Sequence, residues 1–188
     1  LSIYLDCVNM HKKLSMDELN RLDVDAFKEI EKFPYVFILD DIRSMNNIGS
    51  AFRTGDSFRC SHIYLTGITA QPPHREISKT ALGADESVAW SYFEDTVTCI
   101  KHVKDLGYQI VSIEQVENSV SLIDFLPEKN QKYAFVFGNE VFGVNEDWIN
   151  ASDIVLEIPQ FGTKHSLNVS VCIGVIAWDF VSKWKRMA

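Results

Sequence analysis

The sequence predicts an α/β domain, with a parallel sheet of about six strands and helices on both faces. Two observations lead to this fold class. Short apolar segments rich in β-branched and aromatic residues alternate along the chain with longer segments of helical pattern. The strand candidates are also apolar throughout rather than at every second position, which is typical of parallel strands covered on both faces.

Six segments have the composition of strands: 35–40, 62–66, 87–92, 108–113, 133–138 and 153–159. No repeat or long linker divides the region from residue 35 onward. We therefore expect one domain over 35–188, preceded by a helical extension over 1–34.

Helices are expected at 47–59, 75–82, 94–106, 145–150 and 167–186. The first opens on Asn46 and Asn47 and the fourth on Asn145, and asparagine suits an N-cap. In the extension, Ser15 and Glu18 have the spacing of a capping box, which predicts one or two helices before residue 34.

The segment 167–186 is apolar on nearly every side. Leu167, Val171, Val175 and Trp178 share one face, and Val169, Cys172, Ile176 and Phe180 share another. Such a pattern predicts a helix buried all round, and in a chain of 188 residues the outer side needs a second subunit. We therefore expect a homodimer through the C-terminal helix.

Only one of Ser166 and Asn168 can cap this helix, so the other is available for a different role.

The net charge of −8 argues against a general electrostatic binder of nucleic acid. The charge is unevenly distributed, however, because 81–158 carries −10 while 40–80 carries +1 and 159–188 carries +3. A locally basic face on an acidic protein is therefore compatible with the sequence.

No stretch reaches the roughly 18 apolar residues of a membrane span, and the apolar run at the start is too short for a secretory signal. The cysteines lie far apart and form no paired motif: Cys7, Cys60, Cys99 and Cys172. This use of cysteine favours a reducing cytoplasm.

Three polar clusters follow predicted strands, and ligands of α/β sheets bind outside the carboxyl ends of strands. The first contains Asn47 and Arg53, the second has Glu140 between two glycines, and the third contains Ser166 and Asn168. Each cluster alone is explained by helix capping or by an exposed turn.

Together and in this order, the clusters resemble the three motifs of the SpoU (TrmH) family of RNA ribose 2′-O-methyltransferases, in the SPOUT superfamily. The matching stretches are NIGSAFR at 47–53, FGNEVFG at 137–143, IPQFG at 158–162 and SLNVSV at 166–171. The resemblance covers roughly 35–188. It implies a parallel sheet with a C-terminal deep trefoil knot, which general topology would not suggest.

The resemblance further implies a dimer whose active site draws on both subunits, S-adenosylmethionine bound inside the knot, and a tRNA or rRNA substrate. By position, the catalytic set corresponds to Asn47, Arg53, Glu140, Ser166 and Asn168. The cofactor-cradling positions correspond to Ile113, Gly138, Ile158 and Leu167.

A ribose 2′-hydroxyl is a poor nucleophile, so the site must remove its proton or stabilise the developing alkoxide. The family assigns proton removal to the equivalent of Arg53, but a guanidinium is always protonated. We expect Arg53 to clamp the RNA phosphate beside the target ribose and stabilise the oxyanion, and to accept the proton only if that phosphate assists. Glu140 is expected to orient Arg53 or a donor of the partner subunit. Methyl transfer from a sulfonium needs no metal, and the five histidines show no metal-ligand spacing.

Gln160 and Phe161 stand where the family often has Met, which changes the wall of the expected cleft. Two other functions would also suit an α/β domain. A dinucleotide-dependent enzyme would carry G-x-G-x-x-G after the first strand, and that spacing is absent. A catalytically silent RNA-binding homologue stays open.

Overall fold

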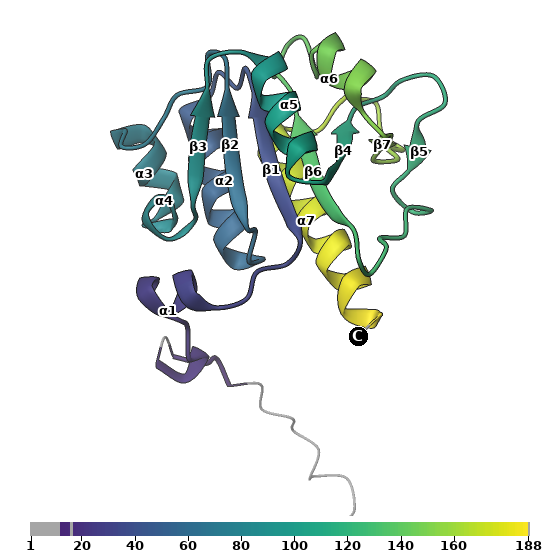
Figure 1. Ribbon diagram of the computed structural model, residues 1–188. Coiled ribbons are helices and arrows are strands. Elements are labelled where there is room, and N and C mark those ends of the chain that lie inside the picture. Colours follow the sequence, from purple (N-terminus) through teal and green to yellow (C-terminus); the bar gives the residue numbers. More distant parts are fainter. Residues whose placement is uncertain (1–11, 16, 188) are drawn as a thin grey trace, which may run out of the picture.

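The computed structural model describes residues 12–15 and 17–187, and in them one parallel sheet lies between two layers of helices (Figure 1). The seven strands run in the order β3-β2-β1-β6-β4-β7-β5. Their bounds are β1 Tyr35–Asp40, β2 His62–Thr66, β3 Trp90–Phe93, β4 Tyr108–Ile113, β5 Val120–Ser121, β6 Lys132–Phe137 and β7 Ile154–Glu157. The predicted α/β class and parallel sheet are confirmed.

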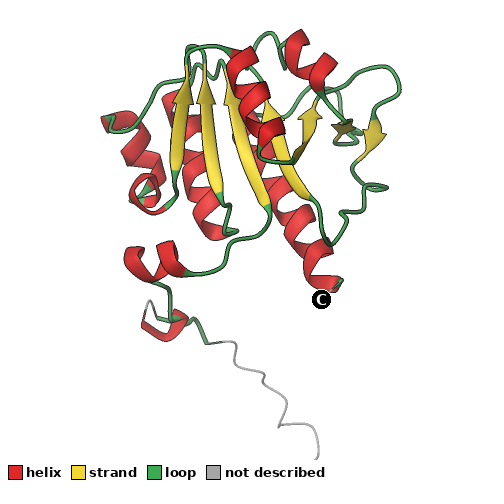
Figure 2. Cartoon of the chain, viewed as in Figure 1, coloured by secondary structure: helices red, strands yellow, loops and turns green. Residues whose placement is uncertain are grey.

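The helices cover both faces of this sheet (Figure 2). In the view of Figure 1, α5 lies in front of the sheet, and α2 and α7 lie behind it. The bounds are α1 Val24–Glu29, α2 Met45–Ser57, α3 Arg75–Ala81, α4 Ala84–Ser87, α5 Thr96–Asp105, α6 Glu146–Ala151 and α7 Val169–Arg186, with a 3₁₀ turn at Asp17–Leu19.

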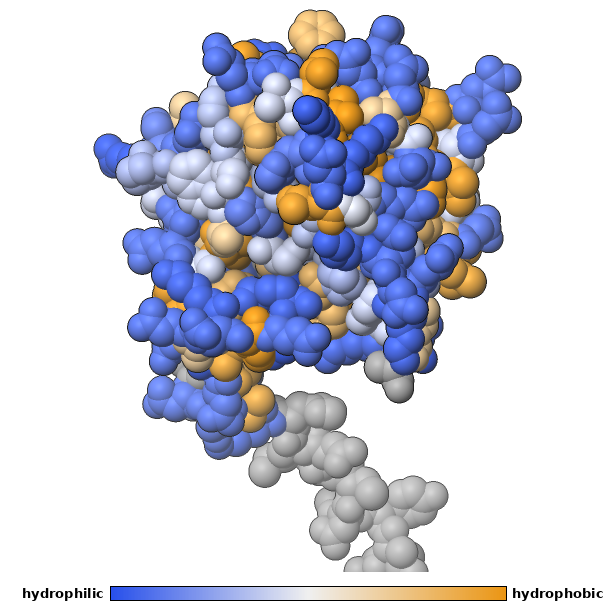
Figure 3. All heavy atoms as spheres, viewed as in Figure 1, coloured by the Kyte–Doolittle hydropathy of each residue, from blue (hydrophilic) through white to orange (hydrophobic). Residues whose placement is uncertain are grey.

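The central strand β1 is buried on both sides, which is why its sequence lacks alternation. Successive side chains of a strand point to opposite faces. Phe37 and Leu39 therefore join the core under α2 and α7, while Val36 and Ile38 join the smaller core under α5 and α6. The surface on the α5 side is mainly hydrophilic, with scattered hydrophobic groups (Figure 3).

Some element boundaries differ from the sequence-based expectation. The expected N-cap at Asn46 or Asn47 is wrong, because α2 begins two residues earlier, at Met45, and Ser44 caps it by accepting a hydrogen bond from the Asn47 N–H at 3.4 Å. The cap at Asn145 is confirmed. The helix expected at 75–82 ends at Ala81, since Leu82 adopts a left-handed conformation with φ 53°, and α4 follows it.

The short strand β5 was not predicted, because two residues are too few to show a period. It pairs with β7 in parallel and extends the sheet beyond the last expected strand.

The N-terminal capping box is present, with the Ser15 N–H donating to Glu18 at 2.7 Å and the Glu18 N–H donating to the Ser15 hydroxyl at 3.3 Å. It opens the 3₁₀ turn. The next helix, α1, places Phe27 in the main core, near α4. The division of the chain at residue 34 stays a prediction.

The chain after β7 lies against two other segments before it enters α7. The carbonyl of Glu157 accepts from the Leu122 N–H at 2.8 Å, and the carbonyl of His165 accepts from the Gln115 amide at 2.9 Å. From α7, Lys183 donates to the Leu122 carbonyl at 2.7 Å. These contacts hold the loop after β4 around the 157–168 segment. They are consistent with the expected trefoil knot, which stays a prediction.

Within one chain, one side of α7 is exposed, so its burial on every side stays a prediction that depends on the expected second subunit. On the face that packs against the sheet, Ile176 and Phe180 are buried, and Val169 and Cys172 are partly buried. On the other face, Val171 is 50% and Trp178 62% exposed. Across the described part of the chain, no helix combines the length and the apolar character needed to cross a membrane.

Helices α2 and α3 meet closely at Gly49. A Cβ at this position would overlap the Thr80 hydroxyl and the Ile77 carbonyl. We expect Gly49→Ala to lower the free energy of unfolding by about 1–3 kcal/mol, because overpacking outweighs the better helix propensity of alanine. Chemical denaturation measures this difference. In the same helix, Ser50→Ala should change stability by less than about 0.5 kcal/mol, and equal effects of the two substitutions would contradict the close approach.

Candidate active site

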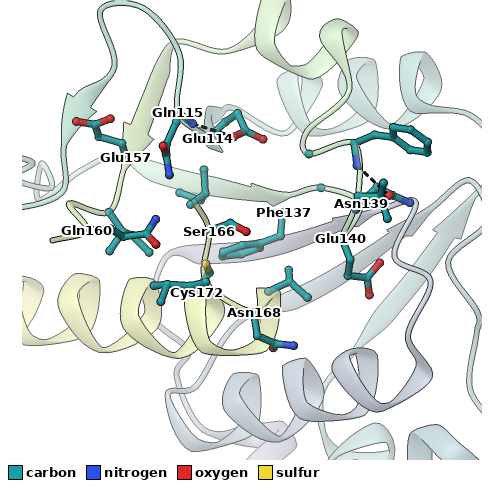
Figure 4. A pocket seen from close by; sticks show the side chains of 18 residues that line it. Glu114, Gln115, Phe137, Asn139, Glu140, Glu157, Gln160, Ser166, Asn168 and Cys172 are labelled. Atoms are coloured by element: carbon teal, nitrogen blue, oxygen red, sulfur yellow. Dashed lines mark hydrogen bonds between the residues drawn. The ribbon is translucent and has the colours of Figure 1, made fainter. Parts of the chain in front are cut away.

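A pocket of about 540 Å³ opens at the carboxyl ends of the parallel strands (Figure 4). Its walls come from the ends of β4 and β6, the chain after β7 and the entry to α7. All four residues predicted to cradle a cofactor line it: Ile113, Gly138, Ile158 and Leu167. Three of the five predicted catalytic residues, Glu140, Ser166 and Asn168, line it as well.

The turn after β6 owes its shape to close backbone contact. A Cβ at Gly138 would overlap the backbone of Gly143, which itself adopts φ 73°, so both positions need glycine. The amide oxygen of Asn139 accepts from the N–H groups of Val141 and Phe142 at 2.9 and 3.2 Å. Its NH₂ group donates to the Asp41 carbonyl at 2.7 Å. Asn139 therefore fixes the turn internally and ties it to the end of β1.

Glu140 projects from this turn onto the N-terminus of α2. Its carboxylate accepts from the N–H groups of Arg43 and Ser44 at 2.9 and 3.0 Å, and from the Asn47 amide at 2.9 Å. Partial burial acts to raise the pKa of Glu140, but these hydrogen bonds outweigh it and lower the pKa below its ordinary value of 4.5. Glu140 is therefore a stable anion at neutral pH and a weak base.

Asn168 connects the third motif to the first. Its Oδ1 caps α7 by accepting from the Ser170 N–H at 2.8 Å, and its Nδ2 donates to Asn47 Oδ1 at 3.3 Å. The expectation that one of Ser166 and Asn168 is free of the cap is confirmed. Ser166 makes no side-chain hydrogen bond with the described residues and is exposed at the pocket.

Arg53 is not brought to the pocket in the single chain. It lies on α2 nearly two turns beyond Asn47, it is exposed, and within 12–15 and 17–187 its guanidinium makes no hydrogen bond or ion pair. Within one chain, Glu140 bonds the start of α2 and makes no hydrogen bond or ion pair with Arg53, so its expected role in orienting Arg53 or a donor of the partner subunit stays a prediction.

Sequence reasoning missed Glu114 and Gln115, which follow β4 and line the pocket. Glu114 accepts from the Val144 N–H at 3.0 Å, so it braces the far end of the turn. Gln115 holds the loop that precedes Ser166, through the His165 carbonyl. Their position at the end of a buried strand was the available signal.

The charged residues of the pocket are the carboxylates Glu114, Glu140 and Glu157. Cys172 also lines it, and burial raises the pKa of its thiol, so the thiol stays protonated at neutral pH. In the described ranges, no group of three or more His, Cys, Asp or Glu side chains is arranged to hold a metal ion.

The convergence of the three motifs at one pocket agrees with comparison to known proteins. The model of the SpoU rRNA Methylase family matches residues 34–178. The chain belongs to the SpoU rRNA Methylase family. It is 25% identical over 150 residues to a tRNA (guanosine(18)-2′-O)-methyltransferase of Borreliella burgdorferi, covering 80% of this chain and 67% of the relative. It is 28% identical over 152 residues to the 23S rRNA (guanosine-2′-O-)-methyltransferase RlmB of Neisseria meningitidis, covering 81% and 60%.

Solved structures support the SpoU fold. An AdoMet-bound rRNA methyltransferase from Sinorhizobium meliloti matches with a TM-score of 0.73 and 24% identity, over 81% of this chain and 58% of that one. The TrmH/SpoU tRNA modifying enzyme of A. aeolicus matches with a TM-score of 0.75 and 21% identity, over 87% and 81%. The chain thus spans about 60 to 67% of the length of these two curated SpoU relatives.

The bonds of Glu140 predict a pH-dependent contribution to stability. Glu140→Gln should lower the free energy of unfolding by roughly 1 kcal/mol at pH 7, because an amide cannot accept all three hydrogen bonds and the site is partly solvated. The native pKa is lowered, so this contribution is complete above pH 4.5 and is lost as the pH falls through the native pKa. Urea denaturation at pH 7 and at pH 3.5 measures it.

The control is Glu117→Gln, at an exposed carboxylate without a side-chain hydrogen bond among the described residues. If Glu140→Gln lowers the free energy of unfolding equally at both pH values, or if Glu117→Gln lowers it by the same amount, the anchoring role of the Glu140 carboxylate is contradicted.

Proposed function

We propose that this chain transfers a methyl group from S-adenosylmethionine to a ribose 2′-hydroxyl of tRNA or rRNA, in the cytoplasm. One observation carries the proposal: Asn47, Glu140 and Asn168, from three motifs far apart in sequence, form a hydrogen-bonded series at the pocket. Membership of the SpoU rRNA Methylase family and the AdoMet-bound neighbour support it.

The pocket residues fit S-adenosylmethionine. The side chains of Ile113, Ile158 and Leu167 offer apolar walls, and the backbone at Gly138 is accessible because no side chain stands there. A pocket of about 540 Å³ is within the usual range for small-ligand sites, and the surrounding carboxylates complement a cationic ligand. When bound, S-adenosylmethionine supplies a methyl group activated by its sulfonium, so metal assistance is unnecessary.

The chain's own residues then position the RNA. Ser166 and the amides of Asn47 and Asn168 are suited to hold the ribose by hydrogen bonds. Glu140 anchors Asn47 and is too weak a base to take the 2′-hydroxyl proton. Arg53 clamps the phosphate beside the target ribose and stabilises the oxyanion, since a guanidinium stays charged.

Arg53 is proposed to act in the site of a second copy, in a homodimer that packs through α7. The exposed apolar face of α7 supports this arrangement, because Val171 and Trp178 would otherwise remain in water. Trp178 also packs near Phe58, at the end of α2, with ring centroids 6.0 Å apart. The helix that carries Arg53 thus adjoins the proposed interface.

Cofactor binding and transfer are tested by titrating S-adenosylmethionine in a calorimeter and following radiolabelled methyl transfer to bulk tRNA and rRNA. We expect Arg53→Ala to bind the cofactor normally and to lose about 10²–10³-fold in transfer rate, as when a single transition-state donor is removed. Arg75→Ala, at another exposed arginine, is the control. Cofactor binding without transfer to any RNA would favour a catalytically silent homologue, and no binding would refute the methyltransferase assignment.

The shared site is tested with two inactive variants, Arg53→Ala and Asn168→Asp. Aspartate keeps the N-cap of α7 but removes the amide that donates to Asn47. A purified heterodimer, carrying a different tag on each subunit, should recover about half of the wild-type transfer, because one of its two sites is intact. No recovery in a stable heterodimer would place Arg53 and Asn168 in the same subunit's site.

A further inference from the structure

A second hollow lies at the opposite end of the sheet from the active-site pocket. It has a volume of about 350 Å³ and lies beside the segments that lead into β1 and β6. Four cations line it, Lys32, Arg59, Lys129 and Lys132, together with Trp184 and one acid, Glu31. We call this hollow the basic groove. Its charge contrasts with the net charge of −8 of the whole chain.

The positive charge of the basic groove is not neutralised by ion pairs. The described ranges contain three ion pairs, Lys12–Glu18, Lys79–Glu76 and Lys183–Asp179, and none of them uses a cation of the groove. Burial and the nearby charge of Arg59 lower the pKa of Lys32, despite the opposing effect of Glu29 and Asp56. Cations that repel one another in this way leave a positive potential.

Neutral acceptors nevertheless hold three of these side chains in place. Lys32 donates to backbone carbonyls at and after the end of α1, including Ile30 at 2.9 Å. Lys132 donates to the Leu106 carbonyl at 2.7 Å, and Lys129 donates to the Met187 carbonyl at 3.4 Å. Carbonyl groups fix an ammonium without cancelling its charge, so these cations are prepared for an anion.

Arg59 stands in the basic groove on an unusual backbone. Its φ is 49°, a left-handed conformation in which glycine or asparagine is common after a helix. Its carbonyl accepts from the Phe33 N–H at 3.1 Å, which fixes its position beside the start of β1. Among the described residues its guanidinium has no hydrogen-bond or ion-pair partner and is available for a bidentate contact.

Trp184 adds a flat surface to the basic groove. Its ring stacks on Phe180 at 5.7 Å between centroids, so its orientation is fixed by the core. Indole rings accept nucleobases by stacking, and a cationic groove with an aromatic platform is the usual combination for single-stranded nucleic acid.

We propose that the basic groove binds the phosphodiester backbone of an RNA segment distant from the nucleotide that is methylated. This inference rests on the proposed function for its choice of RNA as the ligand. The basic groove provides a second RNA contact region, at the amino ends of the strands, and a defined phosphate site on an acidic chain.

The distance between the active-site pocket and the basic groove suits an extended substrate. The six residues of β1 separate the two ends of the sheet, which is about 20 Å at 3.3 Å per residue. An RNA needs several nucleotides to cover that length. A structured RNA that contacts both sites is therefore engaged over several nucleotides, and the groove favours such substrates over short fragments.

The test compares Arg59→Gln/Lys129→Gln with the matched control Lys101→Gln/Lys104→Gln, which removes two positive charges from α5. Binding of bulk tRNA and of rRNA is measured by fluorescence anisotropy at salt concentrations between about 50 and 200 mM. If two phosphate contacts are lost, the slope of log K against log salt should become shallower by about 1.4–1.8, at 0.7–0.9 per contact. The control should keep the wild-type slope.

The charge-conserving variant Arg59→Lys/Lys129→Arg should retain the slope, and S-adenosylmethionine binding should be unchanged in every variant. An unaltered slope in Arg59→Gln/Lys129→Gln, or an equal loss in the control, overturns the RNA-binding groove while methyl transfer still stands. Loss of inorganic phosphate binding with tRNA and rRNA binding intact overturns it in favour of a free-anion site. Failure of the wild type to bind S-adenosylmethionine would instead refute the proposed function.

Discussion

The arrangement of the active site depends on one carboxylate at the start of one helix. The first N–H groups of a helix have no partner within it, and they favour a negative charge. Glu140 places a negative charge at the start of α2, where it accepts from the N–H groups of the N-cap Ser44 and of Arg43 before it, although it lies almost a hundred residues further along the chain. Because Glu140 also holds Asn47, and Asn47 contacts Asn168, one anion sets the relative positions of all three motifs.

Backbone shape provides the second constraint. Gly138 lies so close to the backbone of Gly143 that it has no room for a side chain, and Gly143 adopts φ 73° with the Glu114 carboxylate beside it. Asn139 and Glu114 fix the turn from either side, through the Asp41 carbonyl and the Val144 N–H. The pocket wall is therefore made largely of immobilised backbone, which is suited to hold a cofactor in one geometry. With the backbone fixed in this way, a few hydrogen bonds are enough to hold the side chains proposed as catalytic in place.

Charge is divided between the two ends of the sheet. The pocket at the carboxyl ends is lined by carboxylates, and the basic groove at the amino ends is lined by four cations. The cationic cofactor and the polyanionic RNA that we propose as ligands have complementary surfaces on one small domain. The total charge of −8 hides this division, since local potential, and not net charge, decides which ligand a surface attracts.

Sequence patterns predicted six of the seven strands, most helices and the end of the sheet where the polar motifs gather. Burial imposes a period or an apolar run on each element, and Asn145 was recognised as a cap because capping is local. The fold was needed to show that Ser44, and not a neighbouring asparagine, caps α2. It was also needed to show that Glu140 bonds the start of that helix and that Arg53 lies outside the pocket of its own chain. The bond of Glu140 joins elements about a hundred residues apart. Local pattern reports which face of an element is buried, but it contains no information about the distant partner that the face will meet.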